Sequence, residues 1–212
     1  MLAFIWDMDG TLVDSYPAIV PATQQACADS GIELSAEEIH RQVIRTSVST
    51  FLEELAAERG MDPAPLKARF NELNDSRIDS IRTMPHAEET LKALEEAGHR
   101  NFVFTHRGAS CRAILKQTAL EPYFTEIVTA LNGFPRKPAP DGILYLMAKY
   151  DLTPEQCFYV GDRGLDIDAA LNAGIGSIFY LDPSSPGAPT GRETFIIHDL
   201  LEIPQLVENW MH

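Results

Sequence analysis

Hydrophobic and polar positions follow two different patterns along this 212-residue chain. An apolar run from Leu2 to Trp6 stops abruptly at Asp7, as expected of a buried strand. Residues 16–84 then read as helical throughout, without an alternating run of β-branched residues. From His99 onward, short apolar segments alternate with helical ones. The pattern therefore predicts a strand, a helical insert, and a longer region of strands and helices.

Helix start and stop signals divide the insert into several helices. Gly31 and Gly60 follow two of them, Ser35 begins a capping box with Glu38, and Pro63 begins a last helix that we expect to run towards residue 81. The segment therefore predicts a small all-helical domain.

The second region predicts the strands of one sheet. We expect strands over residues 101–104, 126–129, 157–160, 177–180 and 194–197, with helices over 109–118, 141–150 and 166–173. Such alternation is typical of a doubly wound parallel sheet. We therefore expect an α/β fold, with a Rossmann-like core formed by residues 1–15 and 85–212 and the helical domain over 16–84.

Polar residues stand where the expected strands end. Because parallel strands end at one edge of a sheet, these side chains can meet although they are far apart in sequence. Asp7 and Asp9 are two residues apart in an extended segment, so their side chains point the same way. Two like charges placed together need either a cation or a raised carboxyl pKa. The residues are Asp7 and Asp9, Thr105, Lys137, and Asp162 with Asp166.

Composition narrows the function classes. The chain has 31 acidic and 17 basic residues and a formal charge of -14, which disfavours nucleic acid and anionic membranes as partners. Cys27, Cys111 and Cys157 are widely spaced and odd in number, which argues against both a zinc site and a disulfide framework. We therefore expect them to be reduced residues of the core. Without a basic leader or a long apolar run, we expect a cytoplasmic protein.

Four segments of the chain, DMDGTLVDS, FTHRG, RKPAPD and GDRGLD, carry a resemblance to a known family. In order, spacing and context they are similar to the four motifs of the haloacid dehalogenase superfamily. The resemblance spans nearly the whole chain. It implies that residues 16–84 are the helical cap domain of that superfamily and that the protein is a phosphatase.

A mechanism follows from the resemblance and from charge arguments together. A carboxylate approaches a phosphate dianion only where a metal and a lysine offset the repulsion. Asp7 is the expected nucleophile, forming an aspartyl-phosphate. Asp9 is the expected general acid and base, and its main-chain carbonyl a metal ligand, as the resemblance implies. The oxygen ligands of Asp7 and Asp162 suit Mg²⁺.

The remaining motif residues have expected supporting roles. Asp166 is expected to hold a metal-bound water or to orient Lys137, and Lys137 to pair with the phosphate and the nucleophile. Thr105 and nearby amides are expected to hold phosphoryl oxygens. The alternatives are a solvated surface lysine at Lys137, a helix cap at Thr105 and a turn residue at Asp162.

Two positions depart from the usual motifs of the superfamily. His106 stands where a small or amide residue is common, and Arg163 where serine is common. Together with Arg107 they are candidate substrate contacts, with a place on the rim of the site as the alternative. Arg45 in the helical segment is a further candidate for substrate binding, with an exposed helix arginine as the alternative.

Single residues separate the activities within the superfamily. Asp9 argues against a dehalogenase, which lacks this acid, and Lys67 offers weak support for Schiff-base chemistry. Residues 43–49 lack the glycine expected of a sugar-phosphate mutase. We therefore expect a Mg²⁺-dependent phosphatase acting on a small phosphorylated metabolite, similar to the phosphoglycolate phosphatase-like branch, and a monomer or homodimer. A mutase and a catalytically idle binding or regulatory member remain the alternatives.

Overall fold

The computed structural model describes residues 1–183 and 185–210. The chain divides into two compact units. Met1–Asp14 and Arg82–His212 form what we call the α/β unit, and Ser15–Ile81 form the helical unit. The helical unit begins one residue earlier and ends three residues earlier than the expected segment 16–84.

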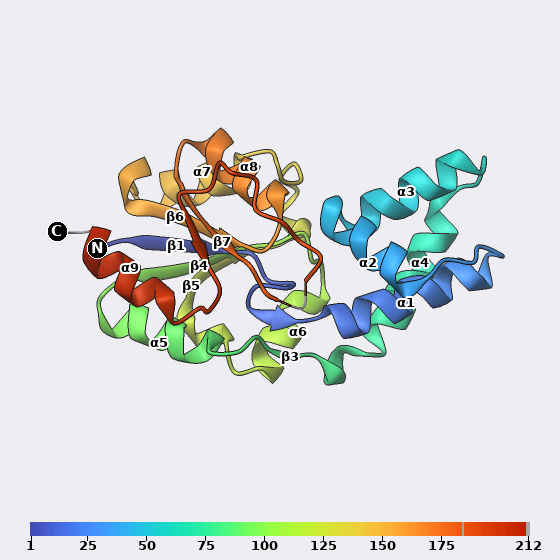
Figure 1. Cartoon of the computed structure of the whole chain (residues 1–212), viewed down its shortest axis with the longest axis horizontal. Helices are drawn as coiled ribbons and strands as arrows, with labels where there is room; N and C mark the ends of the chain where they lie inside the picture. Colours follow the sequence, from blue (N-terminus) through green and yellow to red (C-terminus); the bar gives the residue numbers. More distant parts are fainter. Residues whose placement is uncertain (184, 211–212) are drawn as a thin grey trace. The chain divides into compact units, whose positions relative to one another are not determined.

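A six-stranded sheet forms the centre of the α/β unit (Figure 1). Every pairing between neighbouring strands is parallel. The first strand lies in the middle and is buried along its whole length, which explains its uninterrupted apolar run. In spatial order the strands are β5 (Phe124–Val128), β4 (Arg100–Phe104), β1 (Ala3–Trp6), β6 (Cys157–Gly161), β7 (Gly176–Tyr180) and β8 (Phe195–Ile197).

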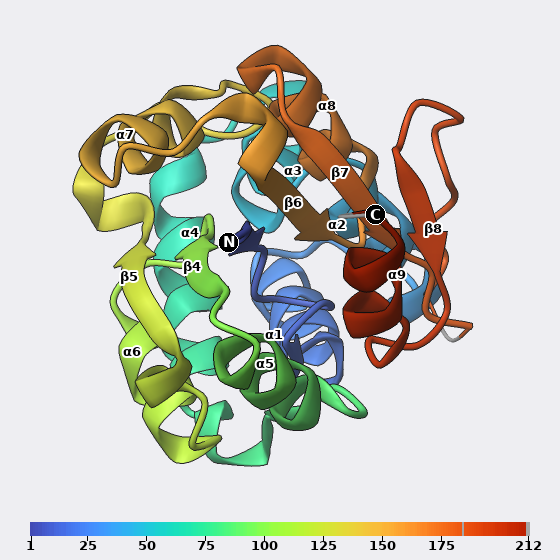
Figure 2. The same cartoon turned by 90° about the vertical axis from the view of Figure 1, so that its left-hand side faces the viewer.

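Helices cover both faces of this sheet. Helix α5 contacts α9, α7 contacts α8, and Figure 2 shows the two pairs on opposite sides of the strands. The predicted doubly wound α/β fold is confirmed. The helices are α5 (Ala87–Glu96), α6 (Ser110–Gln117), α7 (Asp141–Lys149), α8 (Gly164–Ala173) and α9 (Glu202–Trp210), with 3₁₀ turns at Glu121–Tyr123, Ala130–Asn132 and Pro154–Gln156.

A tight loop after β1 leads the chain out of the sheet. Gly10 has a φ of 84°, which favours glycine, and the main-chain oxygen of Met8 accepts hydrogen bonds from Leu12 and Val13. The loop ends in the two-residue strand β2 (Val13–Asp14), which pairs antiparallel with β3 (Arg82–Thr83). The expectation that residues 16–84 contain no strand is therefore wrong at Arg82–Thr83. This strand is too short and too exposed to leave an alternating pattern.

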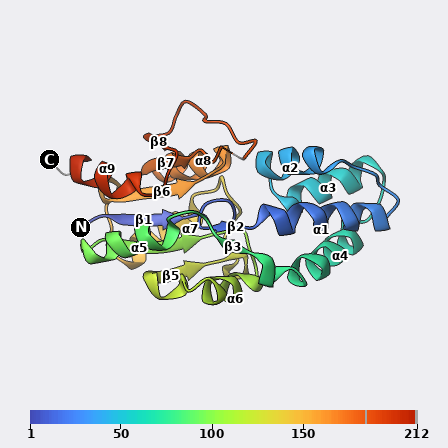
Figure 3. The same cartoon turned by 60° about the horizontal axis from the view of Figure 1, so that its bottom comes forward.

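The helical unit, whose four α-helices are seen in Figure 3, has its own hydrophobic core. Helix α1 contacts α2 and α4, and α3 contacts the same two helices. The predicted capping box at Ser35 is present, because Glu38 Oε2 accepts from Ser35 N at 2.9 Å. The last helix ends at Asp75, earlier than expected, and is followed by a 3₁₀ turn at Ile78–Ser80. The helices are α1 (Tyr16–Asp29), α2 (Ala36–Arg45), α3 (Val48–Glu58) and α4 (Pro63–Asp75).

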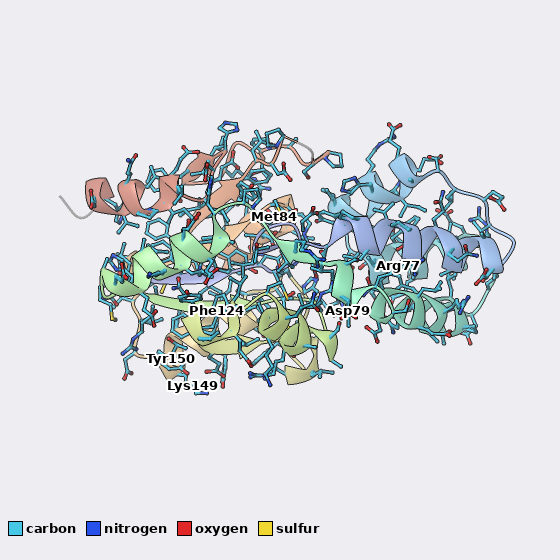
Figure 4. All side chains as sticks on the ribbon, turned by 90° about the horizontal axis from the view of Figure 1, so that it is seen from below. Arg77, Asp79, Met84, Phe124, Lys149 and Tyr150 are labelled. Carbon is cyan, nitrogen blue, oxygen red and sulfur yellow. The ribbon has the colours of Figure 1, made fainter. Side chains whose placement is uncertain are left out.

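One polar cluster, of which Figure 4 labels Lys149 and Tyr150, joins α7 to the edge strand β5. Glu126 accepts a hydrogen bond from the Tyr145 hydroxyl at 2.9 Å and forms an ion pair with Lys149 at 2.8 Å. The ammonium of Lys149 also lies over the rings of Tyr145 and Tyr150. The polar groups of the cluster contact one another, so we assign it a structural role.

The three cysteines are free and buried, as predicted. Among residues 1–183 and 185–210, no helix combines the length and apolar composition that crossing a bilayer requires.

Candidate active site

The strand ends place the motif residues at one edge of the sheet. Asp7 directly follows β1, and its main-chain N–H donates to Val160 O at 2.8 Å. Thr105 follows β4, and its main-chain N–H donates to Val128 O at 3.0 Å. Asp162 follows β6. The sheet ladder thus continues one residue past β1 and β4, which fixes where the side chains of Asp7 and Thr105 begin.

Lys137 is the centre of the site. Its ammonium donates to Asp7 Oδ1 at 2.8 Å, to Asp166 Oδ1 at 2.6 Å and to the Tyr159 hydroxyl at 2.8 Å. Its side chain is 0% exposed. An ammonium has three donors, and all three are used. The alternative of a solvated surface lysine is therefore wrong.

Tyr159 and Thr11 belong to the site although the sequence did not single them out. Tyr159 accepts from Lys137 and donates its own hydroxyl proton to Phe104 O at 2.6 Å. Thr11 donates to Asp162 Oδ1 at 3.2 Å. Thr11 stands inside the first motif, which was a usable signal. Tyr159 lies within an apolar strand, where a buried tyrosine is indistinguishable from a core residue.

Asp166 lies in the first turn of α8 and is fully buried. Its Oδ2 accepts from Arg163 N at 3.2 Å, which caps the helix, while its Oδ1 accepts from Lys137. A Cβ at Gly161 would lie 2.5 Å from the Asp166 Cβ, so only glycine leaves room for this side chain. Asp166 therefore contacts Lys137, one of the two arrangements expected for it.

Arg163 does not lie on the rim. Its Nη2 donates to Asp7 Oδ2 at 2.8 Å, so Lys137 and Arg163 hold opposite oxygens of one carboxylate. Its Nε lies 3.9 Å from Asp162 Oδ1 and 3.7 Å from Asp166 Oδ2. The rim alternative is therefore wrong for this residue.

Arg107 forms a two-pronged ion pair with Asp9. Its Nη2 and Nε lie 2.6 and 3.0 Å from Asp9 Oδ1, and the Nε also lies 3.0 Å from Oδ2. The Arg107 N–H donates to the Thr105 hydroxyl oxygen at 3.1 Å. Helix α6 is preceded by Ala109, so Thr105 stabilises the turn that positions Arg107 and does not cap the helix.

His106 holds the loop that carries Lys137. Its Nε2 accepts from the Lys137 main-chain N–H at 2.6 Å, which assigns the ring proton to Nδ1. Burial, followed by the positive charges of Lys137, Arg136 and Arg163, lowers the pKa of His106 to about 2. The ring is therefore neutral and positions Lys137 through the backbone.

The two carboxylates that share Lys137 have opposite pKa shifts. Burial alone raises the pKa of Asp7, but Lys137, Arg163 and hydrogen bonds from Lys137 and Met8 outweigh it and hold this pKa well below its usual value. Burial also raises the pKa of Asp166, where Lys137 and Arg163 do not offset it and the charge of Asp7 adds to it. Asp7 is thus the carboxylate held in its ionised form.

Asp7, Asp162 and Asp166 form a buried acidic cluster whose candidate ligand oxygens lie within 4.8 Å of one another. The donors are all carboxylate oxygens, the chemistry that Mg²⁺ prefers. The cluster therefore fits the expected metal. Asp9 is not one of these three residues, and its main-chain carbonyl as a ligand stays a prediction.

Arg45 lies in the helical unit. It contacts Gln42 at 2.9 Å and Glu54 at 3.5 Å, and its side chain is mostly exposed. These contacts match an exposed helix arginine, and a role in substrate binding stays a prediction.

The comparisons with known proteins identify the family. Residues 4–180 match the haloacid dehalogenase-like hydrolase family. The chain belongs to that family. The prediction of the family and of a hydrolase is therefore confirmed.

Relatives of the chain match it over almost its whole length. A phosphoglycolate phosphatase from Vibrio vulnificus is 30% identical, over 98% of this chain and 95% of the relative. One from Mannheimia succiniciproducens is 29% identical, over 95% and 96%. A solved hydrolase from Pseudomonas syringae has a TM-score of 0.81 at 25% identity, with 99% of each chain covered. A predicted phosphoglycolate phosphatase from Haemophilus somnus has a TM-score of 0.85 at 23% identity, with 98% covered, and supports the fold.

Proposed function

We propose that the chain is a Mg²⁺-dependent phosphatase that hydrolyses a small phosphorylated metabolite through an aspartyl-phosphate at Asp7. The observation that carries this proposal is the buried carboxylate of Asp7 at the end of the central strand, held by Lys137 at 2.8 Å beside Asp162 and Asp166. The relatives named phosphoglycolate phosphatase support a phosphorylated two-carbon acid as the first substrate to test.

In the first step, Asp7 attacks phosphorus and the bond from phosphorus to the leaving oxygen breaks. The low pKa of Asp7 keeps it ionised for this attack. Lys137 holds its Oδ1 and leaves the carboxylate one defined orientation. Asp9, which has to be in its protonated form for this step, donates its proton to the departing alkoxide.

In the second step, water attacks the phosphorus atom and the bond from Asp7 to phosphorus breaks. Asp9, now ionised, takes the proton from that water. Arg107 positions the Asp9 carboxylate through its two-pronged contact, and Thr105 fixes the turn before Arg107. The products are inorganic phosphate and free Asp7, so the cycle closes.

The other polar groups of the site have proposed roles in binding the metal and the phosphate. Asp7, Asp162 and Asp166 would hold Mg²⁺, directly or through water, together with the carbonyl of Asp9. When bound, the ion would offset the repulsion between Asp7 and the phosphate dianion. Thr105 and Lys137 are the proposed ligands of the phosphoryl oxygens. We also propose that the helical unit is the cap domain of the family, with Arg45 a candidate for substrate choice.

Hydrolysis of p-nitrophenyl phosphate with and without Mg²⁺ tests the proposal. We expect metal-dependent turnover, and a loss of about 10⁴-fold or more in Asp7→Asn. Asp151→Asn is the matched control, because it removes an exposed carboxylate at a turn with a φ of 52°, a conformation that asparagine tolerates. Full activity of Asp7→Asn would overturn the proposal.

A panel of phosphorylated acids, sugars and nucleotides then tests the substrate class. Phosphate release from a phosphorylated two- or three-carbon acid would support it. Interconversion of glucose phosphate isomers without phosphate release would favour the mutase instead.

A further inference from the structure

The guanidinium of Arg163 lies among the carboxylates of the acidic cluster. Its Nη2 is 2.8 Å from Asp7 Oδ2, and its Nε is 3.9 Å from Asp162 Oδ1 and 3.7 Å from Asp166 Oδ2. The side chain is only 8% exposed. Arg163 therefore supplies a fixed positive charge to the three side chains that form the candidate metal site.

A divalent ion and this guanidinium need the same carboxylate oxygens. Lys137 already occupies Asp7 Oδ1, and Arg163 occupies Asp7 Oδ2. The three carboxylates face two resident positive charges, from Lys137 and Arg163. Adding a metal beside both of them brings like charges together in a buried site, where screening is weak.

We propose that Arg163 is an internal counter-cation that competes with the divalent metal for Asp7. In the metal-free protein its guanidinium neutralises the nucleophile, and metal binding requires that it leave Asp7 Oδ2. The inference rests on the proposed function, since it concerns the same metal site. It explains how three buried carboxylates stay together before a metal binds.

The backbone at position 163 allows the side chain to be tested by itself. Arg163 is the residue before α8, in extended conformation, and its main-chain N–H donates to Asp166 Oδ2. Serine is a favoured residue at the position before a helix. Arg163→Ser should therefore keep the contact of the main-chain N–H with Asp166 and remove the positive charge. Arg163→Gln is a second variant, of similar reach and without the charge.

Metal affinity is the readout, because it does not depend on activity. We propose to titrate the metal-free protein with Mn²⁺ and to follow free Mn²⁺ by electron paramagnetic resonance. Both variants should bind about ten-fold more tightly or better than the unaltered protein, as expected when a competing charge is removed. Arg192→Gln is the matched control, because it removes an arginine that pairs with Asp168 in α8 and should leave the affinity unchanged.

Thermal unfolding gives a second readout. Without metal, Arg163→Ser and Arg163→Gln should melt at lower temperature than the unaltered protein, because Asp7 loses a partner. Saturating Mg²⁺ should raise the Tm of the two variants by more than it raises the Tm of the unaltered protein.

The outcomes separate the inference from the proposed function. Equal or weaker Mn²⁺ affinity in both variants, with metal-dependent hydrolysis intact in the unaltered protein, overturns the inference alone. Absence of Mn²⁺ binding in all proteins overturns the inference together with the proposed metal site. Should Arg163→Ser fail to fold, Arg163→Gln decides by the same criterion.

Discussion

Lys137 shows most directly how single residues build this site. The lysine lies between two buried carboxylates, and its charge lets Asp7 stay ionised beside Asp166. The Tyr159 hydroxyl accepts its third donor, so the ammonium is fully paired. We therefore expect catalysis and stability to depend on the same three contacts.

Replacing Lys137 by methionine should damage both properties. It removes the cation that Asp7 and Asp166 share and leaves Arg163 as the cation paired with Asp7, which we expect to cost about 3–5 kcal/mol in the free energy of unfolding. Urea denaturation measures this, and p-nitrophenyl phosphate turnover should also be lost. Lys92→Met, on the exposed face of α5, is the control and should change neither. A fully stable Lys137→Met protein would contradict the central place of this ion pair.

His106 should make stability depend on pH. The pKa of His106 is lowered from 6.5 to about 2 in the folded protein. Below pH 6.5 the unfolded chain therefore binds a proton at His106 that the folded chain does not bind. Stability should therefore be complete above pH 6.5 and fall as the pH drops, by about 1.4 kcal/mol per pH unit in the steep range. Unfolding free energies at several pH values measure this slope.

His106→Gln should remove that part of the slope, because glutamine does not titrate. His198→Gln, at an exposed position, should keep it. An unchanged slope in His106→Gln would show that another group is responsible.

Charge and position in a motif were enough to predict which residues belong to the site. The individual contacts between these residues could not be predicted. Asp7 and Asp162 could be placed together because each directly follows a parallel strand, and Lys137 because it stands in the loop after another one. The burial of Arg163 could not be predicted, since an arginine after an aspartate is more often exposed. The partner of Asp9, ninety-eight residues away, depends on the turn at Thr105, which no local pattern reveals.

At the scale of elements, strands and capped helices were the predictable part. The run Leu2–Trp6 and the segment 157–160 are buried on both faces, which leaves strong apolar signals. Helices α5 and α9, which cover one face of the sheet, were not predicted individually, and β3 was missed. Their sequences carry weaker signals because tertiary packing, more than local propensity, stabilises them.

The cluster between β5 and α7 leads to a prediction at this scale. Burial raises the pKa of Glu126, but hydrogen bonds from Lys149, Tyr145 and Tyr150 outweigh it, and the net pKa is lowered. The pair should therefore contribute stability at neutral pH that is lost as the pH falls through the acid range. Glu126 is partly exposed, so we expect about 1 kcal/mol or less.

Glu126→Gln should remove this contribution at pH 7 and leave stability at low pH nearly unchanged, as measured by urea denaturation. Glu89→Gln, at an exposed position of α5, is the control. Equal losses at both pH values would show that the effect comes from packing and not from charge.

At the scale of the whole molecule, the proposed metal site should couple metal binding to folding. Asp7 follows the first strand of the chain and Asp162 follows β6, so the two are far apart in sequence and converge only in the folded chain. An ion bound there stabilises the folded state, by about 2.7 kcal/mol at a hundred times its Kd. Mg²⁺ should therefore raise Tm, and a chelator should reverse the shift.

Asp162→Asn should weaken this stabilisation, because it removes one charged ligand. Differential scanning calorimetry with and without Mg²⁺ measures it, with Asp151→Asn as the control. A Tm that ignores Mg²⁺ in the unaltered protein would contradict a divalent site in this cluster.

The central claim is that Asp7 itself accepts the phosphoryl group, and Asp9→Asn tests it most directly. p-Nitrophenolate leaves without a proton donor, whereas in the proposed mechanism the release of phosphate from Asp7 requires Asp9 as the base. Rapid mixing of this variant with p-nitrophenyl phosphate and Mg²⁺ should give a burst of about one nitrophenolate per protein, as expected of an accumulating covalent enzyme. Acid quenching and mass spectrometry should then find the phosphate on the peptide that contains Asp7. Steady turnover without a burst, or a phosphate on another residue, would contradict the account.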